Sequence, residues 1–235
     1  MLPREPSTAD SGTPPDEDQA VAGQPQFRYA AVLALMMVAV VFIIAAPNAD
    51  WAHALAIAIE GCALVLTVAT SRERESVRIH RALALGIPTS AVVILIAVGK
   101  APRPLVAAVA ICVTAGIPFA LARGLLRLLR REGVRFNAVA GSLAIYLSTG
   151  LVFAWIVGLI ASVNSTPYFA QHAGDVPIGD KVYFSFTVLT TTGFGDFTPA
   201  TPVGHALAVI EMLTGQLYLV TVIGLLIGNF AARRR

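Results

Sequence analysis

The sequence predicts an all-α polytopic membrane protein: a four-helix N-terminal bundle, then two longer helices flanking a half-length helix and a glycine-containing strand. Hydrophobic residues make up 56% of the chain, charged residues only 13%, and the mean hydropathy is +0.73. This composition is typical of chains that cross a membrane several times. Six apolar segments each approach the length of about 20 residues that a helix needs to cross the hydrocarbon. Basic residues gather in every second connection, as the positive-inside rule expects.

Residues 1–27 precede the first apolar segment and are rich in proline, serine, glycine and acidic residues. Such a composition cannot bury enough apolar surface to fold. We expect a disordered cytoplasmic tail.

The six predicted spans divide into two units. They cover approximately residues 29–46, 52–70, 82–99, 104–121, 138–163 and 203–230. The first four spans belong to a predicted bundle over residues 28–122. A basic connector covers residues 123–136, and the last two spans belong to a second unit over residues 137–235.

The orientation follows from the basic residues. With both termini in the cytoplasm, the inner segments carry 14 of the 17 basic residues. The remaining three, outside, are Lys100, Arg103 and Lys181. This asymmetry predicts a multi-pass protein of the plasma (inner) membrane with cytoplasmic N- and C-termini.

The fourth predicted span, residues 104–121, contains no charged residue, whereas Arg123, Arg127 and Arg130 follow it at helical spacing. We interpret residues 123–136 as an amphipathic connector. Its leucines would face lipid or the following helices, and its arginines, up to Arg135, would face anionic lipid at the inner surface. The alternative is a displaced voltage-sensing segment, since such segments carry arginine at every third position.

Glu60 lies in the middle of the second predicted span, where an ionised carboxylate costs several kcal/mol. We expect a protonated, hydrogen-bonded side chain that faces Thr89, Ser90 or Thr114. A proton-sensing or ligand-sensing role is the alternative.

The segment from Thr190 to Asp196 combines three threonines, two glycines around Phe194, and an acid, between two long apolar segments. Backbone that leaves a helix at membrane depth must be buried in protein or face a water-filled cavity. Glycine at alternate positions allows conformations closed to other residues, in which successive carbonyl groups point the same way. A row of carbonyl oxygens can replace the water shell of a cation.

This segment, Thr-Thr-Gly-Phe-Gly-Asp, resembles the selectivity filter of potassium channels. The resemblance covers roughly residues 137–230 and is to prokaryotic channels with six spans and one pore loop, here without voltage-sensor arginines. It implies ion-binding residues Thr191, Thr192, Gly193, Phe194 and Gly195, with K⁺ held by the carbonyl oxygens of the first four and by the Thr191 hydroxyl. Asp196 would stand at the outer mouth and concentrate cations there.

A half-length pore helix, residues 181–190, would end at this filter, with Asp180 as its cap. The family commonly braces the filter through a tyrosine hydroxyl that Phe194 lacks. We therefore expect support from Tyr183, Thr187 and Glu211, with Glu211 hydrogen-bonded to the pore helix, for example at Thr187 or Tyr183. Gly215, on the last span, stands where the family keeps its inner-helix gating hinge, and close helix packing is the alternative explanation.

The resemblance implies a potassium-selective channel that conducts passively, with no enzymatic step and no voltage gating. The chain has one filter segment, so four copies must surround a shared axis: its partners are three identical subunits and the lipid bilayer, not nucleic acid. K⁺ is the one ligand expected, and no other cofactor. The alternatives are a non-selective cation channel, a voltage-modulated channel using the three arginines after the fourth span, and a secondary transporter. A transporter predicts inverted repeats, which the sequence lacks.

Overall fold

The computed structural model describes residues 27–47, 49–70, 90, 102–132 and 136–224. The described elements are α2 (Phe27–Ala45), α3 (Asp50–Thr70), α5 (Arg103–Glu132), α6 (Phe136–Val163), α7 (Ile178–Leu189), α8 (Pro202–Tyr218) and a π-helix, η1 (Leu219–Ile223). Within these residues the regular secondary structure is helical apart from one isolated bridge between Phe169 and Pro199, and loops cover residues 164–177 and 190–201. The all-α fold class is confirmed.

Three of these helices are long and apolar enough to cross a membrane: Arg103–Arg123, Ala138–Val163 and Pro202–Val222. Shorter apolar helices cover Tyr29–Ala45 and Ala54–Thr67. These five segments match five of the six predicted spans. The third predicted span lies outside the described residues except for Ser90, and the predicted tail lies outside them entirely apart from its last residue.

Helix α5 extends further than the sequence suggested. It runs without interruption from Arg103 to Glu132, so the first part of the predicted connector is its carboxyl-terminal end and not a separate element. Leucine, arginine and glutamate dominate this stretch, and all three favour helix. Arg123 lies over the ring of Phe119, one turn earlier, with its guanidinium carbon 4.0 Å from the ring centroid.

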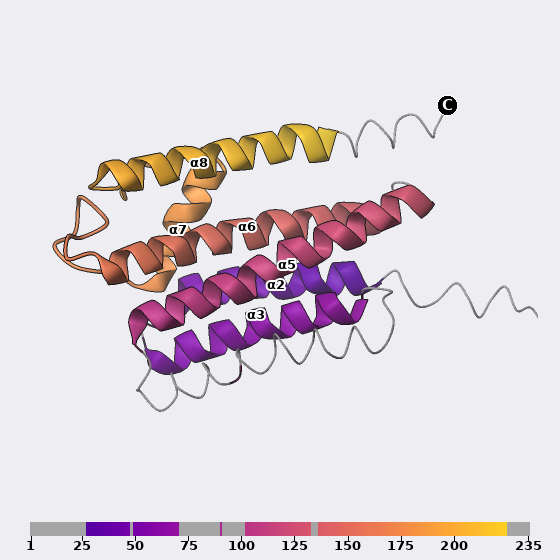
Figure 1. Cartoon of the computed structure of the whole chain (residues 1–235), viewed down its shortest axis with the longest axis horizontal. Coiled ribbons are helices and arrows are strands. Elements are labelled where there is room, and N and C mark those ends of the chain that lie inside the picture. Colours follow the sequence, from indigo (N-terminus) through magenta and orange to yellow (C-terminus); the bar gives the residue numbers. More distant parts are fainter. Residues whose placement is uncertain (1–26, 48, 71–89, 91–101, 133–135, 225–235) are drawn as a thin grey trace, which may run out of the picture.

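Helix α6 is the central helix of the chain. Figure 1 shows α5 and α6 side by side, α2 and α3 beyond them, and α7 running obliquely between α6 and α8. Small residues at the start of α6 permit close packing, since a Cβ added at Gly141 would lie 3.2 Å from the ring of Tyr29 on α2. Helix α2 therefore packs closely against α6 of its own chain.

The Glu60 side chain joins three helices. It is fully buried on α3 and accepts hydrogen bonds from the Thr114 hydroxyl on α5 and from the indole nitrogen of Trp155 on α6, the latter at 3.2 Å. The predicted contact with Thr114 is confirmed. The contact with Trp155 was not predicted, and it connects the N-terminal bundle directly to α6.

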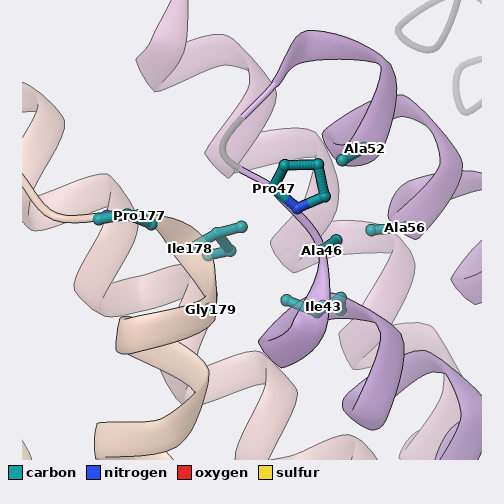
Figure 2. A pocket seen from close by; sticks show the side chains of 8 residues that line it. All are labelled: Ile43, Ala46, Pro47, Ala52, Ala56, Pro177, Ile178 and Gly179. Atoms are coloured by element: carbon teal, nitrogen blue, oxygen red, sulfur yellow. The ribbon is translucent and has the colours of Figure 1, made fainter.

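The start of α7 packs against the end of α2. A Cβ added at Gly179 would lie 2.9 Å from the carbonyl oxygen of Ile43, so this position has no room for a side chain. Figure 2 shows Ile178 directed toward the turn at Pro47, where both line a small pocket. Helix α2 thus positions the beginning of the half-length helix.

The prediction that Asp180 caps this helix is wrong. Helix α7 begins at Ile178, Pro177 occupies the N-cap position with φ −52° and ψ 156°, and no side chain makes a capping bond. Asp180 instead lies in the first turn. Proline supplies an extended residue without a free amide, which suits a helix start, and the carboxylate of Asp180 still lies near the positive end of the helix dipole.

Candidate ion-binding site

The strand after α7 has an alternating backbone conformation. The angle φ is 58° at Thr191, 53° at Gly193 and 82° at Gly195, and Thr191 is the one non-glycine residue with positive φ in the part of the chain that the structure describes. When left-handed and right-handed residues alternate, successive amide groups point to one side of the strand. The carbonyl groups then point to the other side.

The amide side of this strand is turned toward α7. The backbone amides of Thr192 and Gly193 both donate to the carbonyl oxygen of Thr187, at 2.8 and 3.1 Å. Every residue from 190 to 196 is exposed in the single chain. The carbonyl side therefore faces away from α7, toward space that this chain does not fill. Thr187 acts here through its backbone, because its hydroxyl donates to the carbonyl of Phe184 within α7.

Tyr183 supports the outer half of the strand. Its ring stacks on that of Phe194 with centroids 6.3 Å apart and planes 4° apart. The Asp196 carboxylate lies near the Tyr183 hydroxyl and raises the pKa of the phenol. A single tyrosine on α7 thus contacts the ring of Phe194 and lies near Asp196.

The predicted hydrogen bond between Glu211 and the half-length helix is confirmed, but its partner there is neither of the two suggested residues. The side chain is fully buried on α8 and its carboxylate pairs with the Ser185 hydroxyl, not with Thr187 or Tyr183. The same hydroxyl lies 2.7 Å from the Gly150 carbonyl oxygen on α6. Ser185 has one proton for these two acceptors, so satisfying both bonds requires a proton on the Glu211 carboxyl group. This single serine joins α6, α7 and α8.

Gly215 allows α8 to touch the end of α7. A Cβ added there would lie 2.0 Å from the carbonyl oxygen of Leu189, which is closer than any real contact. The Tyr146 hydroxyl on α6 donates to the same carbonyl oxygen at 3.2 Å. The structure therefore gives Gly215 a packing role. Its assignment as a gating hinge stays a prediction, and the π-helix η1 begins four residues further on.

Gln216 contacts the inner end of the strand, which the sequence reasoning missed. Its side-chain nitrogen donates to the Thr191 hydroxyl at 2.8 Å. Three further residues escaped prediction for the same reason, that their partners lie on other helices: Tyr146, Trp155 and Ser185. A polar residue inside an apolar span is a functional signal, and by this rule Gln216 could have been found.

The loop before α7 is tied to the loop after the strand. The amide of Ala170 donates to the carbonyl of Thr198 at 2.9 Å, and His172 stacks on Phe197 with planes 9° apart. Lys181, almost buried in the first turn of α7, pairs with Asp175 at 2.7 Å. These contacts tie the loop before α7 both to α7 and to the loop after the strand.

The chemistry of the strand is that of oxygen ligands. Within the described residues no group of three His, Cys, Asp or Glu side chains could hold a metal ion. The strand instead offers carbonyl oxygens and the Thr191 hydroxyl, which are neutral oxygen ligands suited to a monovalent cation such as K⁺.

Residues 143–231 of this chain match a family described as "Ion channel". Over 65 residues the chain is 35% identical to "Probable potassium channel protein 2" of Methanocaldococcus jannaschii, an alignment that covers 28% of this chain and 15% of that protein. No solved structure matches. The match includes α7, the strand and α8, and it is to ion channels and not to enzymes. Together with the apolar helices, it supports an ion channel in a membrane.

Proposed function

We propose that this chain is one subunit of a homotetrameric, potassium-selective channel that conducts K⁺ passively. The observation that carries the proposal is the strand geometry. Positive φ alternates at Thr191, Gly193 and Gly195, while two amides between and beside them are bonded to the carbonyl of Thr187. This geometry leaves a row of carbonyl oxygens directed away from the protein that supports it.

Exposure of the strand supports assembly. Lipid cannot satisfy free carbonyl groups, so irregular backbone at membrane depth must face protein or a water-filled cavity. Residues 190–196 are exposed in one chain, and the chain has a single strand of this kind. Further copies of the chain are the simplest cover, and four copies around one axis would complete a ring of oxygens.

We assign the role of each residue from its position along the axis that the four copies would share. The carbonyl oxygens of Thr191, Thr192, Gly193 and Phe194 and the Thr191 hydroxyl would bind K⁺, and Gly195 would turn the strand outward. Asp196 would attract cations at the outer mouth. Tyr183, Thr187 and Glu211 would support the filter, and bending at Gly215 would open the inner gate.

The rest of the chain sets the context of the pore. We propose that both termini lie in the cytoplasm of a cell with the channel in its plasma (inner) membrane, and that residues 123–135 contact anionic lipid. Because the apolar part of α5 lacks the arginines of a voltage sensor, the open probability should not follow the membrane potential. No nucleic acid and no cofactor other than K⁺ enters this proposal.

The decisive experiment is a bi-ionic measurement on the purified chain in planar bilayers, with K⁺ on one side and Na⁺ on the other. A reversal potential that favours K⁺ at least about tenfold, a difference of about 1.4 kcal/mol, is the expected outcome. Equal permeability would indicate the non-selective alternative. Saturating, ion-coupled flux would indicate a transporter. A voltage ramp in the same bilayers tests the remaining alternative, a voltage-modulated channel. A steep dependence of the current on voltage would indicate that the arginines after the fourth span act as the voltage sensor.

A further inference from the structure

Thr191 adopts a conformation that its side chain disfavours. Its φ of 58° is left-handed, and a β-branched residue in this region is strained. Gly193 and Gly195 meet the same backbone requirement with φ of 53° and 82° and without that strain. A threonine at this position therefore needs a compensating contact.

The hydroxyl of Thr191 makes two hydrogen bonds. It donates to the carbonyl oxygen of Thr190 at 2.7 Å, and the side-chain nitrogen of Gln216 lies 2.8 Å from it. A hydroxyl has one proton and two lone pairs. Because the hydroxyl donates its one proton to the Thr190 carbonyl oxygen, it can only accept the hydrogen bond from Gln216. One of its two lone pairs then remains free.

The position of Gln216 depends on the glycine before it. A side chain at Gly215 would collide with the carbonyl oxygen of Leu189, so only glycine lets α8 approach this closely. The approach brings the next residue on α8 level with the inner end of the strand. Gln216 is exposed in the single chain, on the side of α8 that reaches the strand.

We propose that Gln216 is a positioning residue for the innermost ion site. Its amide fixes the rotation of the Thr191 hydroxyl. The hydroxyl proton then stays directed at the Thr190 carbonyl oxygen, and the free lone pair faces the conduction axis. Without this amide the hydroxyl can rotate, and its proton then competes with the ion for the same space. The inference rests on the proposed function, because it requires the Thr191 hydroxyl to face the path of the ion.

The test measures Ba²⁺ binding to the purified tetramer by isothermal titration calorimetry, since Ba²⁺ has a radius close to that of K⁺ and divalent charge. Gln216→Met keeps the size of the side chain and removes the amide. It should weaken Ba²⁺ binding about three- to tenfold, the effect of losing one net hydrogen bond. Thr191→Val should weaken binding as well, and Gln216→Met should add nothing further in the Thr191→Val background.

The matched control is Thr214→Val, on the same helix, because the Thr214 hydroxyl bonds to Ile210 within α8 and not to the strand. It should leave Ba²⁺ affinity unchanged. If Gln216→Met does not assemble, Gln216→Asn takes its place, because its amide is one methylene too short to reach Thr191 and must also weaken binding. Unchanged affinity, or effects of Gln216 and Thr191 that simply add, would overturn the inference.

The bi-ionic measurement on the wild-type chain separates this inference from the proposed function. A K⁺-selective wild type whose Gln216 variants bind Ba²⁺ normally contradicts the inference alone. A wild type that carries no selective K⁺ current contradicts the proposed function, and the inference with it.

Discussion

Helices α6 and α8 are both long and apolar, yet the rest of the chain buries very different fractions of their residues. Half of the apolar window of α6 is buried, against 17% for α8. Helix α6 lies between the N-terminal helices and α7, whereas α8 has neighbours on one side only (Figure 1). Within the described residues, the chain therefore covers α6 more fully than it covers α8.

The uncovered surface of α8 is a continuous apolar stripe opposite Gly215. It consists of Ile210, Leu213, Leu217 and Val220, all exposed. Apolar side chains can face lipid, so the stripe by itself does not require a protein partner. The polar strand beside it cannot face lipid, because irregular backbone at membrane depth must face protein or a water-filled cavity. The proposed assembly of several copies would account for this difference.

The largest effect is expected from a bulky residue on the α8 stripe. Leu213→Trp should abolish the tetramer and its K⁺ flux, because a packed interface between copies has no space for an indole ring. Size-exclusion chromatography with light scattering measures the assembly, and vesicle flux measures conduction.

Val41→Trp on α2 is the control for this experiment. Val41 is 61% exposed, and on the side of the bundle that we expect to face lipid an added ring is tolerated. If Leu213→Trp forms a normal tetramer, the stripe faces lipid. The lower burial of α8 would then be no sign of an interface between copies.

A smaller but still severe effect is expected from Gly215→Ala. The added methyl group would meet the carbonyl oxygen of Leu189 at 2.0 Å, so α8 must move away from α7. Overpacking of this kind costs about 3 kcal/mol. Thermal denaturation of the tetramer in detergent should show the loss, together with reduced K⁺ selectivity.

Gly224→Ala is the matched control, because among the residues that the structure describes no atom lies within 4 Å of a Cβ added there. It should leave stability unchanged. A Gly215→Ala channel with wild-type stability and altered opening would contradict the packing explanation and favour the hinge.

The smallest effect is expected within the bundle. Trp155→Phe removes the indole donor to Glu60 and leaves a buried acceptor with one partner fewer, at a cost of about 1 to 3 kcal/mol. Unfolding of the bundle should become easier, while the K⁺ to Na⁺ permeability ratio stays the same because the filter is untouched.

Trp51→Phe on α3 gives the comparison for Trp155, since Trp51 is 57% exposed and is the other tryptophan of the chain. Its unfolding temperature should equal that of the wild type. A changed permeability ratio in Trp155→Phe would show that the bundle and the filter are not separable.

The sequence predicted the strand but not the hydrogen-bond partner of Glu211, and this difference has a physical cause. The strand was found because hydroxyl residues, two glycines and an acid stand together in seven residues. The partner of Glu211 was misassigned because Ser185, Thr187 and Tyr183 lie on one short helix, and its rotation about its axis is invisible in the sequence. Ser185 is the residue that bonds to Glu211 because its side chain faces both α6 and α8.

The sequence by itself determined the apolar segments, the basic asymmetry between their connections and the composition of the strand. Each is a local property, read from neighbouring residues. Only the tertiary structure decided that Gly215 is pressed against Leu189, that Gln216 reaches Thr191, and that Glu60 is shared with α6. These contacts join residues 25 to 95 positions apart, so they depend on how closely the helices approach one another.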